Sequence, residues 1–162
     1  MSVWPGSRTA RFVKQPPEVK INPNGVDVGV SEVWRIEEHA RSTLHGKIRE
    51  TEPPKTLVTP EGDFFVLAKG VYEVRLSNEV EIPQNAVAML LPRSTLNRLG
   101  VIKSETAVWD SGYKGFGTQT VFVPIHSIRI HRDEKWFQLI FMDAEASGTY
   151  EGHWQNEKPV RA

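Results

Sequence analysis

Hydrophobic and polar residues alternate in short runs over most of the chain after residue 63, and this pattern predicts β-strands. The runs are rich in β-branched and aromatic residues, and Gly, Pro and Asn separate them. Many short strands at this spacing indicate an all-β barrel or jelly roll. A proline inside the longest run, Pro124, predicts a bulge or a sheet edge there. The predicted strand runs are 64–70, 71–77, 80–83, 86–92, 105–110, 118–130 and 135–142.

The first part of the chain gives a weaker pattern. Residues 1–24 are rich in Pro, Lys and Arg and contain several turn signals, so we expect an extended lead-in. Valines alternate with Asp27 at the start of segment 26–36, which predicts a strand. Residues 31–44 also fit an amphipathic helix, but we favour a strand followed by a loop. We expect a charged surface loop at 45–62.

One short block, PRSTLNRLG at residues 92–100, predicts a short helix. Ser94 or Thr95 is placed to cap its start, and Gly100 stands where helices commonly end. The first amides of such a helix have no partner inside it, and Arg93 adds positive charge nearby. The block is therefore a candidate phosphate-binding segment. The apolar face of this helix consists of Leu96 and Leu99.

A second block, WDSGYKG at residues 109–115, predicts a turn that presents an acid. Asp110, Ser111 and Gly112 are typical turn residues between two strand-like runs. Asp110 and Tyr113 then flank the tip of the turn. A carboxylate on a rigid turn is a candidate general base.

In combination, the two blocks resemble the second and third motifs of the trimeric dUTPase and dCTP deaminase superfamily. GVDVGV at residues 25–30 is similar to the first motif of that superfamily, and KWFQLIF at 135–141 to the fourth. The resemblance covers about residues 19–155. It implies a distorted jelly-roll fold, a homotrimer, and magnesium-dependent hydrolysis of dUTP to dUMP and pyrophosphate.

The resemblance also implies roles for individual residues. Asp110 matches the acid that activates the attacking water, and Tyr113 matches the aromatic residue that stacks on the deoxyribose. Asp27 matches the aspartate that holds magnesium through water. Magnesium suits this role because it prefers hard oxygen ligands and keeps bound waters. The matched or candidate phosphate contacts are Arg93, Ser94, Arg98, Lys114 and Gln138.

The last segment, 144–162, loses the strand pattern but carries Tyr150 and Trp154. Its YEGHWQ sequence resembles the tail of the deaminase branch. We therefore expect a β domain at 1–143, lead-in included, followed by a mobile C-terminal arm. The arm is predicted to order over the nucleotide with one aromatic side chain near the base.

A single position separates the two enzymes of the superfamily. In the deaminase branch, a proton-shuttling glutamate lies ten residues after the motif aspartate, and here that position holds Thr120. Threonine cannot act as a carboxylate near neutral pH, and no acidic residue lies between Tyr113 and Asp133. A dUTP diphosphatase is thus the leading interpretation. The alternatives are a dCTP deaminase or bifunctional enzyme, and a non-catalytic deoxynucleotide-binding homologue.

The amino-acid composition excludes several other classes of function. The chain has 162 residues with 20 basic and 20 acidic side chains, so broad electrostatic binding to nucleic acid or to a membrane is not expected. It has no cysteine, which excludes disulfides and the cysteine-ligated zinc deaminases. His126 and His131 have an odd spacing on a predicted strand and so point to opposite faces, which does not suit a shared metal. Without a secretory signal or a membrane-spanning run, we expect a cytoplasmic protein.

Overall fold

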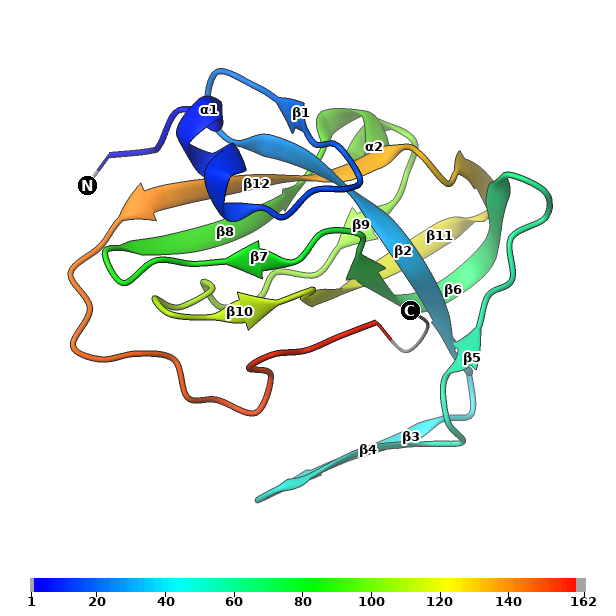
Figure 1. Cartoon of the computed structure of the whole chain (residues 1–162). Helices are drawn as coiled ribbons and strands as arrows, with labels where there is room; N and C mark the ends of the chain where they lie inside the picture. Colours follow the sequence, from blue (N-terminus) through cyan, green and yellow to red (C-terminus); the bar gives the residue numbers. More distant parts are fainter. Residues whose placement is uncertain (1, 160–162) are drawn as a thin grey trace.

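The structure is a computed structural model that describes residues 2–159. It is all-β and forms a nearly closed, barrel-like sheet of the distorted jelly-roll type, as the alternation predicts (Figure 1). Six strands follow one another in the order β8-β12-β2-β6-β11-β9, and β1 and β5 both pair with β2. The bounds along this sheet are β8 (Ala86–Pro92), β12 (Lys135–Asp143), β2 (Val26–Ile36), β6 (Phe64–Leu76), β11 (Thr118–His131), β9 (Ile102–Lys103), β1 (Lys20–Ile21) and β5 (Thr56–Leu57).

Strand β2 joins the two halves of the sheet. Its first residues pair with β12, with Asp27 opposite Gln138, and its later residues pair with β6 from Val30 onward. The segment is therefore strand as far as Ile36, within the predicted strand at 26–36, and the amphipathic helix considered for residues 31–44 is absent. Pairing with neighbouring strands satisfies the backbone hydrogen-bonding groups of this segment. These tertiary contacts favour a strand where the sequence pattern alone fits either a strand or a helix.

Strands β6 and β11 are the longest pair, and they carry the predicted bulge. The two runs expected at 64–70 and 71–77 form one continuous strand. Their register shifts between Val123 and Ser127, around Pro124. A proline there donates no ladder hydrogen bond, so the irregularity lies where the sequence predicts it.

The lead-in is folded and not simply extended. It forms helix α1 (Gly6–Thr9) and the 3₁₀ turn η1 (Ala10–Phe12), and Trp4 is buried. The Trp4 ring packs at 5.4 Å from Phe141, and its Nε1 donates to the Asp143 carboxylate at 2.7 Å. The N-terminal segment thereby covers one part of β12 and joins the core. Sequence periodicity misses it because one buried tryptophan makes no repeating pattern.

A hairpin at 41–52 replaces part of the loop expected after the first strand and the first part of the loop expected at 45–62. Strands β3 (Arg41–His45) and β4 (Ile48–Glu52) pair only with each other and project away from the barrel (Figure 1). Leu44 and Ile48 are exposed near the turn of this hairpin. The expectation of a loop is wrong because a hairpin without a buried face carries no apolar alternation to reveal it.

The connection between β8 and β11 holds both sequence blocks. Helix α2 (Ser94–Arg98) begins after Arg93, so neither Ser94 nor Thr95 is its cap. Leu96 is buried and Leu99 is exposed. The strand expected at 105–110 is absent, apart from one isolated bridge between Trp109 and Ala88. After the turn at Asp110, β10 (Lys114–Gly115) pairs with β7 (Val80–Glu81).

Among residues 2–159, no helix has the length and apolar character needed to cross a membrane.

Candidate active site

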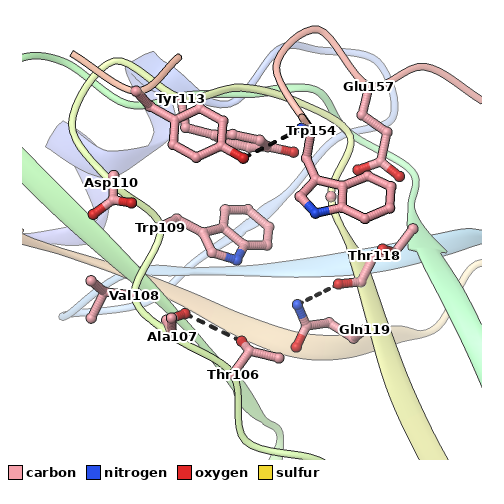
Figure 2. A pocket seen from close by; sticks show the side chains of 12 residues that line it. Thr106, Ala107, Val108, Trp109, Asp110, Tyr113, Thr118, Gln119, Trp154 and Glu157 are labelled. Carbon is pink, nitrogen blue, oxygen red and sulfur yellow. Dashed lines mark hydrogen bonds between the residues drawn. The ribbon is translucent and has the colours of Figure 1, made fainter. Parts of the chain in front are cut away.

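A cavity of about 320 Å³ opens beside the turn that follows β9, between the barrel and the C-terminal arm. Figure 2 shows its aromatic walls, Trp109, Tyr113 and Trp154, with Asp110 at one side and Glu157 at the other. Cavities of this size that combine aromatic walls with a few polar groups are typical small-molecule sites.

Tyr113 and Trp109 form one wall. Tyr113 is buried, its ring lies 5.4 Å from Trp109 and 5.5 Å from Tyr150, and burial raises the pKa of its phenol well above the ordinary value. A Cβ at Gly117 would lie 2.5 Å from the Trp109 ring, and the φ of Gly117 is +53°. Only glycine therefore allows the indole to lie flat against this backbone.

The turn holds Asp110 at the rim of the cavity. Tyr113 N donates to Asp110 O at 3.1 Å, and Gly112 has the positive φ of +83° that the Asp-Ser-Gly sequence predicts. The Ser111 hydroxyl donates to Ala86 O at 2.7 Å, which fastens the turn to β8. The Asp110 side chain is exposed, and within residues 2–159 no hydrogen bond or ion pair engages its carboxylate. It is free to accept a proton from a bound water.

The arm lies docked on this turn. Gln155 holds it with its amide: Oε1 accepts from Lys114 N at 2.8 Å, and Nε2 donates to Gly112 O at 2.9 Å. Asn156 N adds a bond to Lys114 O at 2.7 Å, and Tyr150 N one to Ser111 O at 2.9 Å. Tyr150 and Trp154 consequently reach the cavity that Tyr113 lines. The last part of the predicted arm, residues 160–162, lies outside the described residues.

An ion pair fixes the end of the arm. The Glu157 carboxylate lies 3.3 Å from Arg75 Nη2 of β6, and both side chains are largely buried. Arg75 also donates to Lys158 O and lies 3.8 Å from Glu32. Burial raises the pKa of the Glu157 carboxyl, and the charge of Arg75 offsets only part of that rise. The sequence does not reveal this acid as a cavity residue, because it lies 38 residues beyond Gln119, the cavity residue on β11.

A second cluster gathers five of the predicted site residues at the far end of β8: Asp27, Arg93, Ser94, Arg98 and Gln138. Asp27 is 4% exposed, and its carboxylate accepts from Arg93 Nε at 2.9 Å and from Asn22 Nδ2 at 2.6 Å. Arg93 also donates to Lys135 O at 2.8 Å. Its guanidinium therefore braces strands β2 and β12 beside Ser94.

The other predicted phosphate contacts differ in whether their polar groups already have partners in the structure. Gln138, opposite Asp27 on β12, donates to Asn24 O at 2.9 Å. Ser94 and Arg98 are exposed on α2. Lys114 lies away from this cluster, on β10, with its ammonium 3.8 Å from Glu81.

The two clusters are far apart within one chain. Trp109 pairs with Ala88 in antiparallel orientation, which places Asp110 beside Val87, six residues before Arg93. At 3.3 Å per residue, the separation along β8 is about 20 Å. A general base must lie within about 3 Å of the water it activates. One chain alone therefore does not bring Asp110 and the Ser94 cluster onto the same phosphate.

The described residues do not fit a protein-held metal. Within residues 2–159, no three Asp, Glu or His side chains gather in a group that suits an ion. Both Asp27 oxygens already accept hydrogen bonds from Arg93 and Asn22, and the side chain is almost inaccessible. Asp27 thus braces Arg93 and Asn22, and its water-mediated contact with magnesium stays a prediction.

Comparison with known proteins identifies the family of this chain. Residues 7–144 match the model of the dCTP deaminase-like family. The chain belongs to that family. The match of the family model ends where the arm begins.

Archaeal relatives of the family align over most of the chain. A probable deoxyuridine 5'-triphosphate nucleotidohydrolase of Methanosarcina barkeri is 36% identical over 143 residues, which are 86% of this chain and 83% of that protein. Proteins with the same name are 35% identical in Methanopyrus kandleri, over 85% of this chain and 88% of that protein, and 32% identical in Halobacterium salinarum, over 94% and 93%.

A solved structure shares the fold. The dCTP deaminase of Agrobacterium tumefaciens superposes with a TM-score of 0.66 at 16% identity, over 88% of this chain. This chain spans about half of that protein, at 48% of its length.

Proposed function

We propose that the protein is a dUTP diphosphatase that converts dUTP to dUMP and pyrophosphate. The observation that carries the proposal is a free, exposed Asp110 carboxylate at the rim of an aromatic cavity. It occurs in a chain 32–36% identical to several proteins named probable dUTP nucleotidohydrolases. The resemblance of WDSGYKG to the third motif and the geometry of the turn both support Asp110 as the reactive group.

The proposed reaction is an in-line displacement at the α-phosphorus. Asp110 accepts a proton from a water, the water oxygen bonds to the α-phosphorus, and the bond from this phosphorus to the α,β-bridging oxygen breaks. Pyrophosphate leaves with that oxygen. Asp110 then releases its proton to solvent, and dUMP dissociates.

The cavity is the proposed seat of the nucleoside. Tyr113 is proposed to offer a ring face to the deoxyribose, with Trp109 packed against it at 5.4 Å. Tyr150 and Trp154 of the arm cover the same space. Docking of the arm would exclude water from the reacting centre, as lids do in other enzymes.

The triphosphate is proposed to meet the second cluster of another copy of the chain. Ser94, Arg98 and Gln138 supply hydrogen-bond donors, and Arg93, braced by Asp27, adds positive charge. Lys114, nearer the cavity, is a further candidate contact. Because about 20 Å separates Asp110 from this cluster within a chain, the two must come from different copies to act on one substrate.

An exposed apolar patch supports such an assembly. We define the α2–β11 patch as Leu99, Ile102, Phe122 and Ile125, all exposed. Ile102 and Phe122 are cross-strand partners, and a Cβ at Gly100 would lie 3.5 Å from the Ile125 side chain. An exposed apolar patch of this kind is suited to bind a second copy. We propose a homotrimer, the assembly that the motif pattern implies.

Magnesium is proposed as a counter-ion of the substrate. It binds phosphate oxygens well because it prefers hard ligands and retains waters. The engagement of Asp27 by Arg93 argues that the triphosphate, and not this carboxylate, holds the ion. Neither nucleic acid nor a membrane is a proposed partner, and we propose a cytoplasmic location.

Deamination is the second candidate activity, and the site argues against it. Thr120 occupies the position of the deaminase glutamate, and its carbonyl bonds to Ser104 N at 2.9 Å on the strand edge. Glu157 does enter the cavity, but it is paired with Arg75. A non-catalytic nucleotide-binding role would not explain why a free Asp110 carboxylate lies at the rim of the cavity.

The test is product analysis with the purified protein, magnesium and separate dUTP, dCTP and dTTP. We expect dUMP and pyrophosphate from dUTP, and no ammonia from dCTP. Ammonia release at a rate comparable with dUTP hydrolysis would establish the deaminase. Binding of dUTP without any product would establish the non-catalytic alternative.

A further inference from the structure

Arg75 lies where the end of the C-terminal arm meets the barrel. Both neighbours of Arg75 on β6 are buried in the core, so Arg75 itself faces outward. Its cross-strand partners are Glu32 on β2 and Thr118 on β11, and the three side chains share this outer face. Thr118 lines the cavity, and so does Glu157 of the arm, on the side away from Asp110 (Figure 2). The arm therefore ends on a row of side chains that leads to the cavity.

The barrel side of this contact is electrically balanced without the arm. Arg75 Nε lies 3.8 Å from the Glu32 carboxylate, and Lys55 pairs with Glu73, which shares the outer face of β6 with Arg75. The docked arm adds a third carboxylate, that of Glu157, at 3.3 Å from Arg75 Nη2. Within the described part of the chain, no other cation forms an ion pair with Glu157. Docking thus leaves one negative charge in surplus at a largely buried contact.

A surplus charge that is buried favours the binding of a proton. Desolvation raises the pKa of the Glu157 carboxyl and outweighs the opposing charge of Arg75, while Glu73 raises this pKa further and Lys55 lowers it. The charge of Glu157 in turn adds to the rise in the pKa of the Tyr113 phenol that burial produces. The Lys158 side chain next to Glu157 is exposed, so its ammonium remains in water.

We propose that the arm closes over the cavity through a proton-linked latch, in which Arg75 receives the Glu157 carboxyl and closing takes up a proton. The proposal rests on the proposed function, because it assumes that the closed arm covers bound nucleotide. The proton moves from solvent to a Glu157 carboxylate oxygen, and no other bond changes. 

The direction of the pH effect follows from the raised pKa of docked Glu157. An undocked arm leaves this carboxyl in water with its ordinary pKa, so the docked arm holds a proton more readily than the free arm. The gain in docking is fully present below the ordinary pKa and is lost as the pH rises through the raised one. Arg75 offsets part of the charge of Glu157, which allows the arm to close when this carboxyl is ionised.

The first experiment measures docking in the absence of nucleotide. The Asn156 amide donates to Lys114 O at 2.7 Å when the arm is docked, so its protection factor in hydrogen exchange reports the docking constant. We expect the wild-type protection factor to rise as the pH is lowered from about 8 to about 4.5. Glu157→Gln keeps the size of the side chain but cannot ionise, and should lose this pH dependence. A constant wild-type protection factor, or an undiminished pH dependence in Glu157→Gln, would overturn the proposal.

Two arm residues supply the controls. Glu151→Gln is the same substitution at an exposed acid and should keep the wild-type pH dependence. His153 is also exposed and has an ordinary titration range near neutral pH, so His153→Gln should keep it too. Loss of the pH dependence in His153→Gln would assign the proton to that imidazole and overturn the assignment to Glu157.

A pair of variants separates the charge of Arg75 from its packing. Arg75→Met should weaken docking at pH 8 by about 10- to 150-fold, because a hydrogen bond between charged groups is lost while Glu157 stays ionised. Adding Glu157→Gln to Arg75→Met should restore at least tenfold of the lost protection, since the arm then brings no charge to the contact. Equal weakening by Arg75→Met in the presence and absence of Glu157→Gln would show a purely structural role and contradict the latch.

The second experiment connects the latch to the substrate. Isothermal titration calorimetry compares the affinity of wild type and Glu157→Gln for the α,β-imido analogue of dUTP. Apparent affinity follows the docked fraction, so the variant should bind at least as tightly as wild type at pH 8, and the two affinities should converge as the pH falls. Weaker binding by the variant throughout would mean that the carboxylate contacts the nucleotide, and would overturn the latch. Failure of the proposed function would look different: dUTP would release no pyrophosphate, whereas the pH-dependent protection of nucleotide-free protein would persist.

Discussion

The hydrogen bonds of Gln155 allow the docking of the C-terminal arm to be tested directly. Gln155→Met keeps the length of the side chain but removes the bonds to Lys114 N and Gly112 O, at 2.8 and 2.9 Å. Each such bond contributes about 0.5–1.5 kcal/mol, so docking should weaken by about 1–3 kcal/mol. This corresponds to a 5- to 150-fold smaller docking constant.

Amide hydrogen exchange measures this change at one site. The Asn156 amide donates to Lys114 O only while the arm is docked, and this bond does not use the substituted side chain, so its protection factor should fall by the same 5- to 150-fold. The control is Glu151→Ala, an exposed position of the arm, which should leave protection unchanged. Undiminished protection in Gln155→Met would refute the idea that this amide holds the arm.

Kinetics then connect the arm to the reaction. As the docked fraction falls, the apparent affinity for dUTP falls in proportion to it. Gln155→Met should therefore have a KM for dUTP between that of wild type and that of a protein truncated after Asp143. If the truncated protein had wild-type kinetics, the arm would have no role in the site.

Three further predictions concern the assembly, the second cluster and the N-terminal segment. Ile102→Glu in the α2–β11 patch should give a monomer by light scattering and abolish dUTP hydrolysis, whereas Leu44→Glu on the projecting hairpin should change neither. Asp27→Asn should lower the melting temperature, because it removes the buried carboxylate that pairs with Arg93, without changing the magnesium concentration for half-maximal activity. The Ser2 hydroxyl, ahead of other donors, lowers the pKa of Asp143, so the stabilising effect of this carboxylate is present above about pH 4 and lost as pH falls through the lowered pKa. The difference in melting temperature between wild type and Asp143→Asn should therefore shrink from pH 7 to pH 3.

The sequence predicts the barrel and the turn because both depend on local chemistry. Strands with one buried face show the alternation that identifies them, and Pro124 marks its own bulge. Gly112 adopts the positive φ that the Asp-Ser-Gly turn requires. These features depend only on residues that are close in the sequence, so they can be predicted without knowledge of the fold.

Other features depend on contacts that no local pattern encodes. Residues 105–110 look like a strand, yet they line the cavity with only one bridge to β8. The docking of Gln155 on Gly112 and the pairing of Glu157 with Arg75 join segments about 40 and 80 residues apart. The ion pair between Asp27, the predicted metal residue, and Arg93 also joins segments that are distant in the sequence.

The central claim is that Asp110 activates the water that attacks dUTP. Its most direct test is the single-turnover rate of dUMP formation in wild type and Asp110→Asn, measured beside the affinity of each protein for the α,β-imido analogue of dUTP. The substitution keeps the size of the side chain and removes the proton acceptor. The account predicts a rate reduced by about 10²- to 10⁴-fold with affinity within about tenfold, because a base acts mainly in the transition state. A variant that forms dUMP at close to the wild-type rate would contradict it.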